Sequence, residues 1–223
     1  MRRSRIFAVP LLLALGCSGA PEPAAIDWTT DRIASFDDQA IEIDGEPSVI
    51  ESPFGPALYF DGQDDALQID SHPLQGAGEF TIEMLFRPDS GGSSEQRVLH
   101  LQQDDSSDRI LLETRLVGEQ WFMDSYIKSD DEGYTLFARE HLHPLDQWFH
   151  VALVVDGERM TQYVNRRREL TRKIEFLPPA TGRTSLGVRI NHVDWFRGAV
   201  RRIRFTPSAL SPDEFFAVEP DSD

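Results

Sequence analysis

The sequence has a single cysteine, few basic residues and no long apolar segment after its first residues. One cysteine in 223 residues cannot form a disulfide within the chain, so a disulfide-stapled fold is excluded. Only 22 Lys and Arg residues stand against 38 Asp and Glu, and this net charge of -16 argues against binding the phosphates of nucleic acid. Hydrophobic residues make up 40% of the chain and aromatic residues 10%, which suffices for a core. We therefore expect one acidic globular domain.

The first 16 residues predict a signal peptide. Three arginines precede an apolar run of about eleven residues, which is shorter than the roughly 20 residues of a membrane-spanning helix. The lone cysteine, Cys17, follows Ala14-Leu15-Gly16, and this pattern resembles the lipobox of bacterial lipoproteins. The resemblance implies lipidation of Cys17, and Ser18 after it resembles outer-membrane sorting in Gram-negative bacteria. We expect an exported outer-membrane lipoprotein, with an ordinary secretory signal as the alternative.

The remaining chain divides into three parts. Residues 17–27 are rich in small residues and proline, which predicts a flexible, lipid-anchored spacer. Residues 28–217 are expected to form the folded domain, and residues 218–223 a frayed acidic tail. Cleavage before Cys17 would leave 19 basic and 38 acidic residues, a charge of -19.

The folded part has the pattern of an all-β protein. Polar turns separate short runs rich in β-branched and aromatic residues, and each run predicts a strand. The runs are 57–60, 66–70, 79–86, 97–101, 109–115, 120–127, 133–137, 148–155, 160–164, 184–189 and 196–205. Asp156-Gly157 predicts a tight hairpin between two of them. Residues 211–216 alone look helical, because Ser211 and Glu214 have the spacing of a capping box and Pro212 suits a first helical turn.

Four segments in order carry a family resemblance. Residues 55–69, 80–88, 148–165 and 196–215 resemble the successive strand motifs of laminin-G-like domains. The resemblance implies a concanavalin A-like antiparallel jelly-roll β-sandwich with a short C-terminal helical turn. Domains of this kind typically recognise glycans or proteins, but the fold also hosts enzymes, so function must be argued from a site.

The acidic residues give no sign of catalysis. Retaining glycosidases need two carboxyl groups about 5–5.5 Å apart, and enzymes of this fold carry them in a Glu-x-Asp-x-x-Glu type pattern that is missing here. Glu79 and Glu83 lie four residues apart in one strand, which separates them by roughly 13 Å. We interpret them as solvent-facing acids opposite basic residues, and Asp124 offers no better pair. A polysaccharide hydrolase would require two carboxylates within about 6 Å in a groove.

Calcium is a possible cofactor. Asp61 and Asp64 supply the turn oxygens that this ion prefers, and laminin-G-like domains often bind it. Relatives commonly have an aspartate where this chain has Arg201, so a salt bridge from Arg201 could replace the ion. Capping of the turn by the same aspartates is the alternative.

Positive charge gathers late in the chain. Residues 159–204 contain twelve basic and three acidic residues, a charge of +9, whereas the rest of the mature chain carries -28. One interpretation is a surface for an acidic ligand, and the other is pairing of these arginines with acids on neighbouring strands. The candidate ligand-binding residues are Asn165, Arg166, Arg168, Arg202, Arg204 and, for stacking on a sugar, Trp195.

These features together predict a non-catalytic cell-envelope lipoprotein. Its sandwich would recognise carbohydrate or an extracellular or envelope protein, and it would contact the membrane through its lipid anchor alone. A glycoside hydrolase on the same fold and a structural subunit of an envelope complex are the alternatives.

Overall fold

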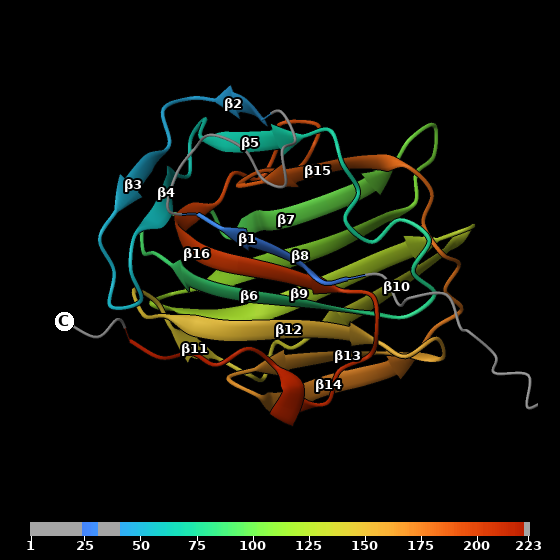
Figure 1. The fold of residues 1–223 in the computed structure, drawn as a ribbon. Coiled ribbons are helices and arrows are strands. Elements are labelled where there is room, and N and C mark those ends of the chain that lie inside the picture. Colours follow the sequence, from blue (N-terminus) through green and yellow to red (C-terminus); the bar gives the residue numbers. More distant parts are fainter. Residues whose placement is uncertain (1–23, 31–40, 221–223) are drawn as a thin grey trace, which may run out of the picture.

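The structure is a computed structural model that describes residues 24–30 and 41–220 (Figure 1). The expected signal peptide, Cys17 and most of the expected spacer lie outside the described residues. No helix in the described part is long and apolar enough to span a bilayer. Figure 1 shows two antiparallel sheets, one behind the other, with hydrophobic side chains between them.

The first sheet contains eight strands, all paired antiparallel. Its order is β14 (Arg167–Lys173), β13 (Arg159–Val164), β12 (Phe149–Val155), β6 (Phe80–Pro88), β16 (Arg197–Thr206), β4 (Ala57–Asp61) and β3 (Ser48–Ile50), and β1 (Ile26–Thr29) pairs with β16. The long central strands β6 and β16 hold this sheet together, and β1 and β4 follow one another along the same edge of β16.

The second sheet also contains eight antiparallel strands. Its order is β10 (Glu132–Phe137), β9 (Gln120–Ser129), β8 (Arg109–Val117), β7 (Glu95–Gln103), β15 (Gly182–Leu186), β5 (Ala66–Ile69) and β2 (Ile41–Asp44), and β11 (His143–Pro144) pairs with β9. Chain segments alternate between the two sheets, so this is the jelly-roll sandwich that the family resemblance implies. The predicted all-β fold class is confirmed.

The core lies between the inner faces of the sheets. Side chains alternate along each strand, so every second residue points inward. Phe86 of β6 meets Trp121 of β9 edge to face across the sheets, with ring centroids 5.2 Å apart, and Phe149 packs on the same indole. Rings in this arrangement add about 0.5–1.5 kcal/mol each beyond their buried area. The core therefore locks the central strands of both sheets in place.

Several elements differ from those that the sequence predicts. Strand β14 was not expected because Arg167–Lys173 is almost all polar, and it forms an edge strand whose side chains are largely exposed. Strand β1 begins at Ile26, two residues inside the expected spacer. The predicted C-terminal helical turn is a three-residue 3₁₀ turn, η1 (Pro212–Glu214), in which the Glu214 carboxylate accepts hydrogen bonds from Ser211 as the capping box predicts.

The C-terminal strap, residues 207–217, covers the outer face of the first sheet. In Figure 1 it crosses in front of β12 and β13. Phe215 packs against Ala152 and Val154 of β12 and against Tyr163 of β13. Thr81 of β6 fastens the start of the strap by accepting a hydrogen bond from the amide of Leu210 (2.9 Å) and donating one to a strap carbonyl.

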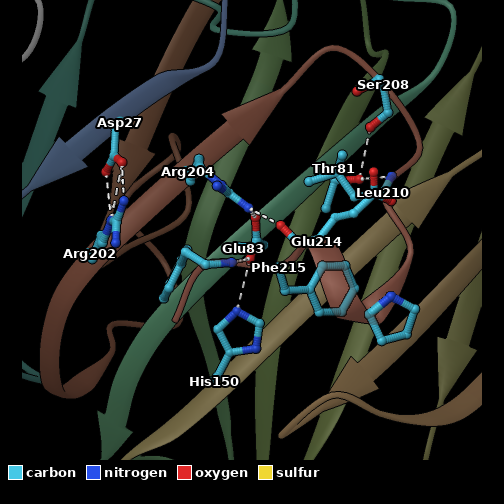
Figure 2. A network of polar contacts seen from close by, with 12 residues as sticks. Asp27, Thr81, Glu83, His150, Arg202, Arg204, Ser208, Leu210, Glu214 and Phe215 are labelled. Atoms are coloured by element: carbon cyan, nitrogen blue, oxygen red, sulfur yellow. Dashed lines mark hydrogen bonds and ion pairs between the residues drawn. The ribbon is translucent and has the colours of Figure 1, made fainter. Parts of the chain in front are cut away.

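Glu83 ties the strap to the sheet, and its environment corrects the expectation that it faces solvent. Its side chain is fully buried, with an exposure of 0%. Figure 2 shows the carboxylate between Arg204, His150 and the strap. It accepts hydrogen bonds from Arg204 Nε (2.6 Å) and from the backbone amide of Phe216 (2.7 Å), and His150 Nε2 lies 3.1 Å away. The expected basic residue opposite Glu83 is present, but the strap seals the pair from water.

Candidate functional site

The outer face of the second sheet is hollowed, unlike the strap-covered face. On β8, Ile110 and Leu112 point into the core, so Leu111, Glu113 and Arg115 point outward. Together with β9, β10 and the loop between β15 and β16, they line a groove of about 380 Å³. The groove residues are Arg97, Arg109, Leu111, Glu113, Arg115, Asp124, Tyr126, Thr135, Phe137 and Arg189.

Two carboxylates form the floor of this groove. Glu113 of β8 and Asp124 of β9 are direct cross-strand partners, with exposures of only 4% and 3%. Both contact one nitrogen: Arg115 Nη2 lies 3.1 Å from Glu113 Oε2 and 2.8 Å from Asp124 Oδ2. Since both carboxylates touch the same atom, they lie within about 6 Å of each other, which is the proximity that glycosidic chemistry requires. The sequence did not predict this pair.

Two arginines balance the carboxylates. Arg115 also pairs with Glu95 at the rim, and Arg97 Nε lies 2.7 Å from Glu113 Oε1. Strand β7 places Arg97 on the outer face because a bulge between Arg97 and Leu99 shifts the alternation of side chains. Bulges often re-aim a side chain beside a functional site. Without the bulge between Arg97 and Leu99, Arg97 and His100, which are three residues apart, would lie on opposite faces of the sheet.

Burial changes the acidity of the groove. It raises the pKa of Glu113 from 4.5 to about 7, because desolvation outweighs the attraction of Arg97. The pKa of Asp124 is raised for the same reason, against the pull of Arg115. The pKa of His100 is lowered to about 3 by burial and by the positive charges of Arg189, Arg109 and Arg97. His100 is therefore neutral at physiological pH, and Glu113 can gain a proton there.

Arginines and aromatic rings form the walls. The Arg109 guanidinium stacks 4.9 Å from the ring centroid of Tyr126, and that of Arg115 lies 6.0 Å from Phe137. Phe137 exposes 45% of its surface, so its ring is open to a ligand. Asp124 Oδ1 and His100 Nε2 are buried polar atoms without a hydrogen bond in the described part of the chain. Such atoms are costly in a closed core and are usually paired.

A signal for the carboxylate pair exists in the sequence. Strands β8 and β9 are joined by only two residues, Gly118 and Glu119. A two-residue turn fixes the register, so Val117 pairs with Gln120 and, four residues further from the turn, Glu113 pairs with Asp124. Recognition of this turn in the sequence would have predicted the pair.

The predicted basic residues take other positions. Arg166 donates hydrogen bonds to the carbonyls of Pro212, Phe215 and Phe216 in the strap, which explains why a long side chain stands at a φ of 63° where glycine is favoured. Asn165 Oδ1 accepts from the amide of His150 at 3.0 Å.

Two further arginines of the predicted surface form ion pairs. Arg204 pairs with Glu83, and Arg202 pairs with Asp27 beside the ring of Phe216. Arg168 is exposed on the edge strand β14. These arginines serve the strand pairing and the strap, as the second interpretation proposed, and the structure does not gather them into the groove. Their binding of a ligand stays a prediction.

Trp195 is not part of the groove either. It is half-buried in the loop before β16 and packs edge to face on His192, with centroids 5.8 Å apart. A second hollow, of about 460 Å³, lies beside this loop at β2, β5 and β15, where His192 is one of the lining residues. The proposed sugar contact of Trp195 therefore remains a prediction.

The structure brings the expected calcium residues together. Carboxylate oxygens of Asp61, Asp64 and Asp65 lie within 4.8 Å of one another, and no other group of three or more such ligands occurs in residues 24–30 and 41–220. Their chemistry fits calcium. However, Asp61 Oδ1 accepts the amide of Gln63 at 2.8 Å, which is the expected turn capping, and both oxygens of Asp65 accept backbone amides, from Glu46 and from Asp61. Calcium binding by Asp61 and Asp64 stays a prediction.

The expected bridge from Arg201 is not formed. Arg201 occupies a bulge in β16, and its Nε donates to the carbonyl of Phe54 at 2.6 Å. Arg197 lies beside the aspartate turn instead, and its Nη1 donates to the carbonyl oxygen of Asp61 at 2.9 Å. The cross-strand register explains the exchange, because Arg197 is the direct partner of Asp61.

Comparison with known families agrees with this architecture. Residues 61–215 match the laminin-G family Laminin_G_3, described as the concanavalin A-like lectin/glucanases superfamily. The match spans most of the chain, so the chain belongs to this superfamily, and the resemblance to laminin-G-like domains is confirmed. A comparison with curated proteins finds no match.

Solved structures share the fold at low identity. Domain 4 of AbnA, an extracellular GH43 arabinanase from Geobacillus stearothermophilus in complex with arabinotriose, is 15% identical, with a TM-score of 0.63, and the match covers 79% of this chain and 85% of that domain. The binding domain of Paraclostridial Mosquitocidal Protein 1 is 11% identical (TM-score 0.63; 85% of this chain, 49% of that one). The binding domain of botulinum neurotoxin DC in complex with SialylT is 13% identical (TM-score 0.57; 79% and 44%). The chain thus spans about half of the toxin binding domains.

Proposed function

We propose that this protein is a non-catalytic, lipid-anchored envelope protein that binds a glycan in the groove on its second sheet. The observation that carries the proposal is the buried Glu113–Asp124 pair, held by Arg97 and Arg115 on a face that no described segment covers. The glycan complexes of two structural neighbours, with arabinotriose and with SialylT, support it.

The chemistry of the groove suits a saccharide. Carboxylates and guanidinium groups present pairs of acceptors and donors in fixed planes, and neighbouring sugar hydroxyls can bind such pairs. The half-exposed ring of Phe137 beside Asp124 can stack on the apolar face of a pyranose. Pre-arranged polar groups reduce the ordering cost of binding, because the ion pairs already fix their rotamers.

A glycan array with the full mature chain tests the proposal. The array is run with and without a calcium chelator and at two salt concentrations, and the Phe137→Ala variant is compared with Leu177→Ala, which changes a 58% exposed residue outside the groove. We expect at least one glycan class to bind, with affinity about tenfold lower in Phe137→Ala alone. Absence of any binding, or equal loss in both variants, would refute recognition in this groove.

A hydrolase remains the second candidate because of one observation. Glu113 and Asp124 are as close as a glycosidase pair, and the pKa of Glu113, about 7, would suit a general acid. Arg115 argues against catalysis, because it donates hydrogen bonds to both carboxylates and is their counter-ion. Release of reducing ends from any bound polysaccharide, lost in Glu113→Gln, would establish hydrolysis, whereas binding without release supports the proposal.

Anchoring to the envelope needs its own test, which the groove does not supply. In a Gram-negative host, the wild-type chain is expected to incorporate labelled palmitate and to sediment with outer membranes. Cys17→Ala is expected to lose the label and to appear in the soluble fraction. A soluble, unlabelled wild-type protein would contradict the lipoprotein assignment.

A further inference from the structure

We infer that the groove selects an acidic saccharide, whose carboxylate lies between Arg109 and Arg189. The inference rests on the proposed function, because it assigns the charge of the glycan that the groove binds. It concerns two arginines that play no part in holding Glu113 and Asp124.

The charge of the groove is the first step. Four guanidinium groups but only two carboxylates line it, although the chain as a whole has 38 acidic and 22 basic residues. Arg97 and Arg115 face these two carboxylates and also Glu95 and Asp194 at the rim, so this end of the groove holds two arginines and four acids. The remaining pair, Arg109 and Arg189, gives its own wall of the groove a positive charge in an otherwise acidic protein. A concave site with such a charge attracts anions.

Arg109 and Arg189 lack partners of opposite charge within the described residues. Neither Arg109 nor Arg189 forms an ion pair with any carboxylate in the described part of the chain. Arg109 makes one hydrogen bond, from Nη1 to the carbonyl of Ser107 (2.8 Å), and its Nε is buried without one. Both are half-buried. Some half-buried arginines elsewhere pair with a carboxylate, as Arg87 does with Asp89 and Arg204 with Glu83, and others, such as Arg197, donate several hydrogen bonds to backbone carbonyls. No hydrogen bond or ion pair of the Arg189 guanidinium is found among the described residues, and Arg109 makes a single one.

The neighbouring groups show that the two arginines face one space. Arg109 and Arg189 both line the groove, and His100 on β7 is buried nearby: burial, and then the charges of Arg189 and Arg109, lower the pKa of His100. Its Nδ1 accepts the amide of Ile190 at 3.0 Å, so the remaining proton is on Nε2, which has no acceptor within the described residues. The two guanidinium groups line the same groove, and no carboxylate of the described residues pairs with either of them. Guanidinium groups bind carboxylates in a planar, two-bonded geometry.

The ligand is assigned as a saccharide because the anion site adjoins the sugar-binding features proposed above. Tyr126 links the two, since its ring lies under Arg109 and its strand continues to Asp124. A uronate or sialate could place its carboxylate on the arginines while its ring hydroxyls reach Asp124. An acidic peptide would satisfy the arginines but has no ring of neighbouring hydroxyl groups to donate to the Asp124 oxygen that is free within the described residues.

The test uses glycan pairs that differ in charge alone. Isothermal titration of the full mature chain compares oligogalacturonate with its methyl ester, and sialyllactose with lactose. Variants Arg109→Gln and Arg189→Gln are compared with Arg159→Gln, which removes an exposed arginine at the start of β13 in the other sheet. Melting temperatures verify folding, and Arg189→Lys supplies a second variant that keeps the charge but loses the planar donor fork.

We expect the acidic member of at least one pair to bind about tenfold or more tightly than its neutral partner. Arg109→Gln and Arg189→Gln should remove this preference without weakening the neutral glycan, Arg189→Lys should retain part of it, and Arg159→Gln should change nothing. Equal binding of both members, or a preference that survives both groove variants, overturns the inference and leaves the proposed function intact. Binding of polyglutamate that is equally sensitive to Arg189 overturns the assignment to a saccharide. Failure of every glycan to bind refutes both proposals.

Discussion

The two sheets of this protein carry similar polar groups on their outer faces but use them differently. Glu83 on the first sheet and Glu113 on the second are both buried carboxylates paired with an arginine of an adjacent strand. The strap covers Glu83 and donates a backbone amide to it, whereas Glu113 lies at the floor of a groove beside a second carboxylate. A buried ion pair therefore does not by itself identify a functional site. A pair that another segment covers stabilises the fold, whereas a pair at the floor of an open groove is accessible to a ligand.

The difference extends to the partners of the two centres. Around Glu83, hydrogen bonds from an arginine, a histidine and the strap satisfy the carboxylate oxygens. In the groove, an oxygen of Asp124 itself and a nitrogen of His100 have no hydrogen bond within the described residues, whereas beside Glu83 the carboxylate oxygens are paired and Nδ1 of His150 lacks a partner. Natural proteins pair nearly all buried polar atoms, and exceptions concentrate where something else is to bind. The predictions below separate these two roles, beginning with the largest effect.

Replacement of Glu83 should damage stability and leave recognition intact. Glu83→Gln removes the charge opposite Arg204 and presents an amide to donors, so we expect unfolding to become easier by about 3 kcal/mol, near the lower limit for breaking a buried pair. In a domain of this size that corresponds to a fall of about 6–12 °C in melting temperature. Urea unfolding followed by tryptophan fluorescence measures the change.

Glu79→Gln is the matched control, because Glu79 is an exposed acid next to the same strand. It should change stability by less than about 0.5 kcal/mol. A Glu83→Gln protein as stable as this control would show that the strap does not depend on the carboxylate. Loss of glycan affinity in folded Glu83→Gln would contradict the separation of the two faces.

The corresponding change in the groove should act on binding. Asp124→Asn keeps the shape but removes a charged acceptor, and we expect glycan affinity to fall about tenfold to a hundredfold. Asp131→Asn, an exposed turn residue outside the groove, is the control and should bind as the wild type does. Titration calorimetry measures both variants. Equal affinities would place the binding site elsewhere, with the hollow at β2, β5 and β15 as the next candidate.

The fold was easier to predict from the sequence than the groove. Runs such as 57–60 and 148–155 are mostly apolar and rich in β-branched or aromatic residues, so their strands were evident, and the family resemblance ordered them. Strand β14 gave no hydrophobic signal, because an edge strand exposed on both faces needs none. The groove depends on which acids meet across strands, and register decides that. The two-residue turn at Gly118-Glu119 makes the register of β8 and β9 predictable from the sequence, whereas the bulge at Arg97 has no recognisable sequence pattern.

The arginines illustrate the same limit. Their number in residues 159–204 predicted a ligand surface, yet Arg166, Arg202 and Arg204 bind the strap or its neighbours. Arg189 of that segment does line the groove, but its partner there, Arg109, lies outside the segment. Charge counts along a chain do not reveal which guanidinium groups already have partners, because most partners are distant in sequence.

The stability of the groove should depend on pH through Glu113. Its pKa is about 7 in the folded protein against 4.5 normally. Between these pH values the folded state holds a proton on Glu113 that the unfolded chain has released. The contribution of this proton to the free energy of unfolding is therefore fully present below pH 4.5 and is lost as pH rises through 7. Relative to Glu113→Gln, the wild type should therefore lose on the order of 1–3 kcal/mol between pH 5 and pH 8. Urea unfolding of both proteins at the two pH values measures this difference.

A difference between the two proteins that is independent of pH would mean that Arg97 and Arg115 keep Glu113 charged throughout. The variant Glu95→Gln separates the two explanations, because Glu95 is exposed and the pKa of its carboxyl is lowered by its hydrogen bond to Arg115. The stability that the wild type has over Glu95→Gln should rise with pH, in contrast to that over Glu113→Gln, and by a small amount.

The smallest expected effect belongs to the aspartate turn, which lies on neither outer face. If Asp61 and Asp64 bind calcium with the weak affinity of extracellular sites, a concentration tenfold above the dissociation constant should stabilise the protein by about 1.4 kcal/mol. Asp64→Asn should abolish this gain, whereas Asp70→Asn, an exposed acid on the next turn, should retain it. The backbone amides that occupy Asp65 and the guanidinium of Arg197 on the Asp61 carbonyl compete with the ion, so the gain can fall to zero. A melting temperature that calcium and chelator leave unchanged would identify the three aspartates as turn caps alone.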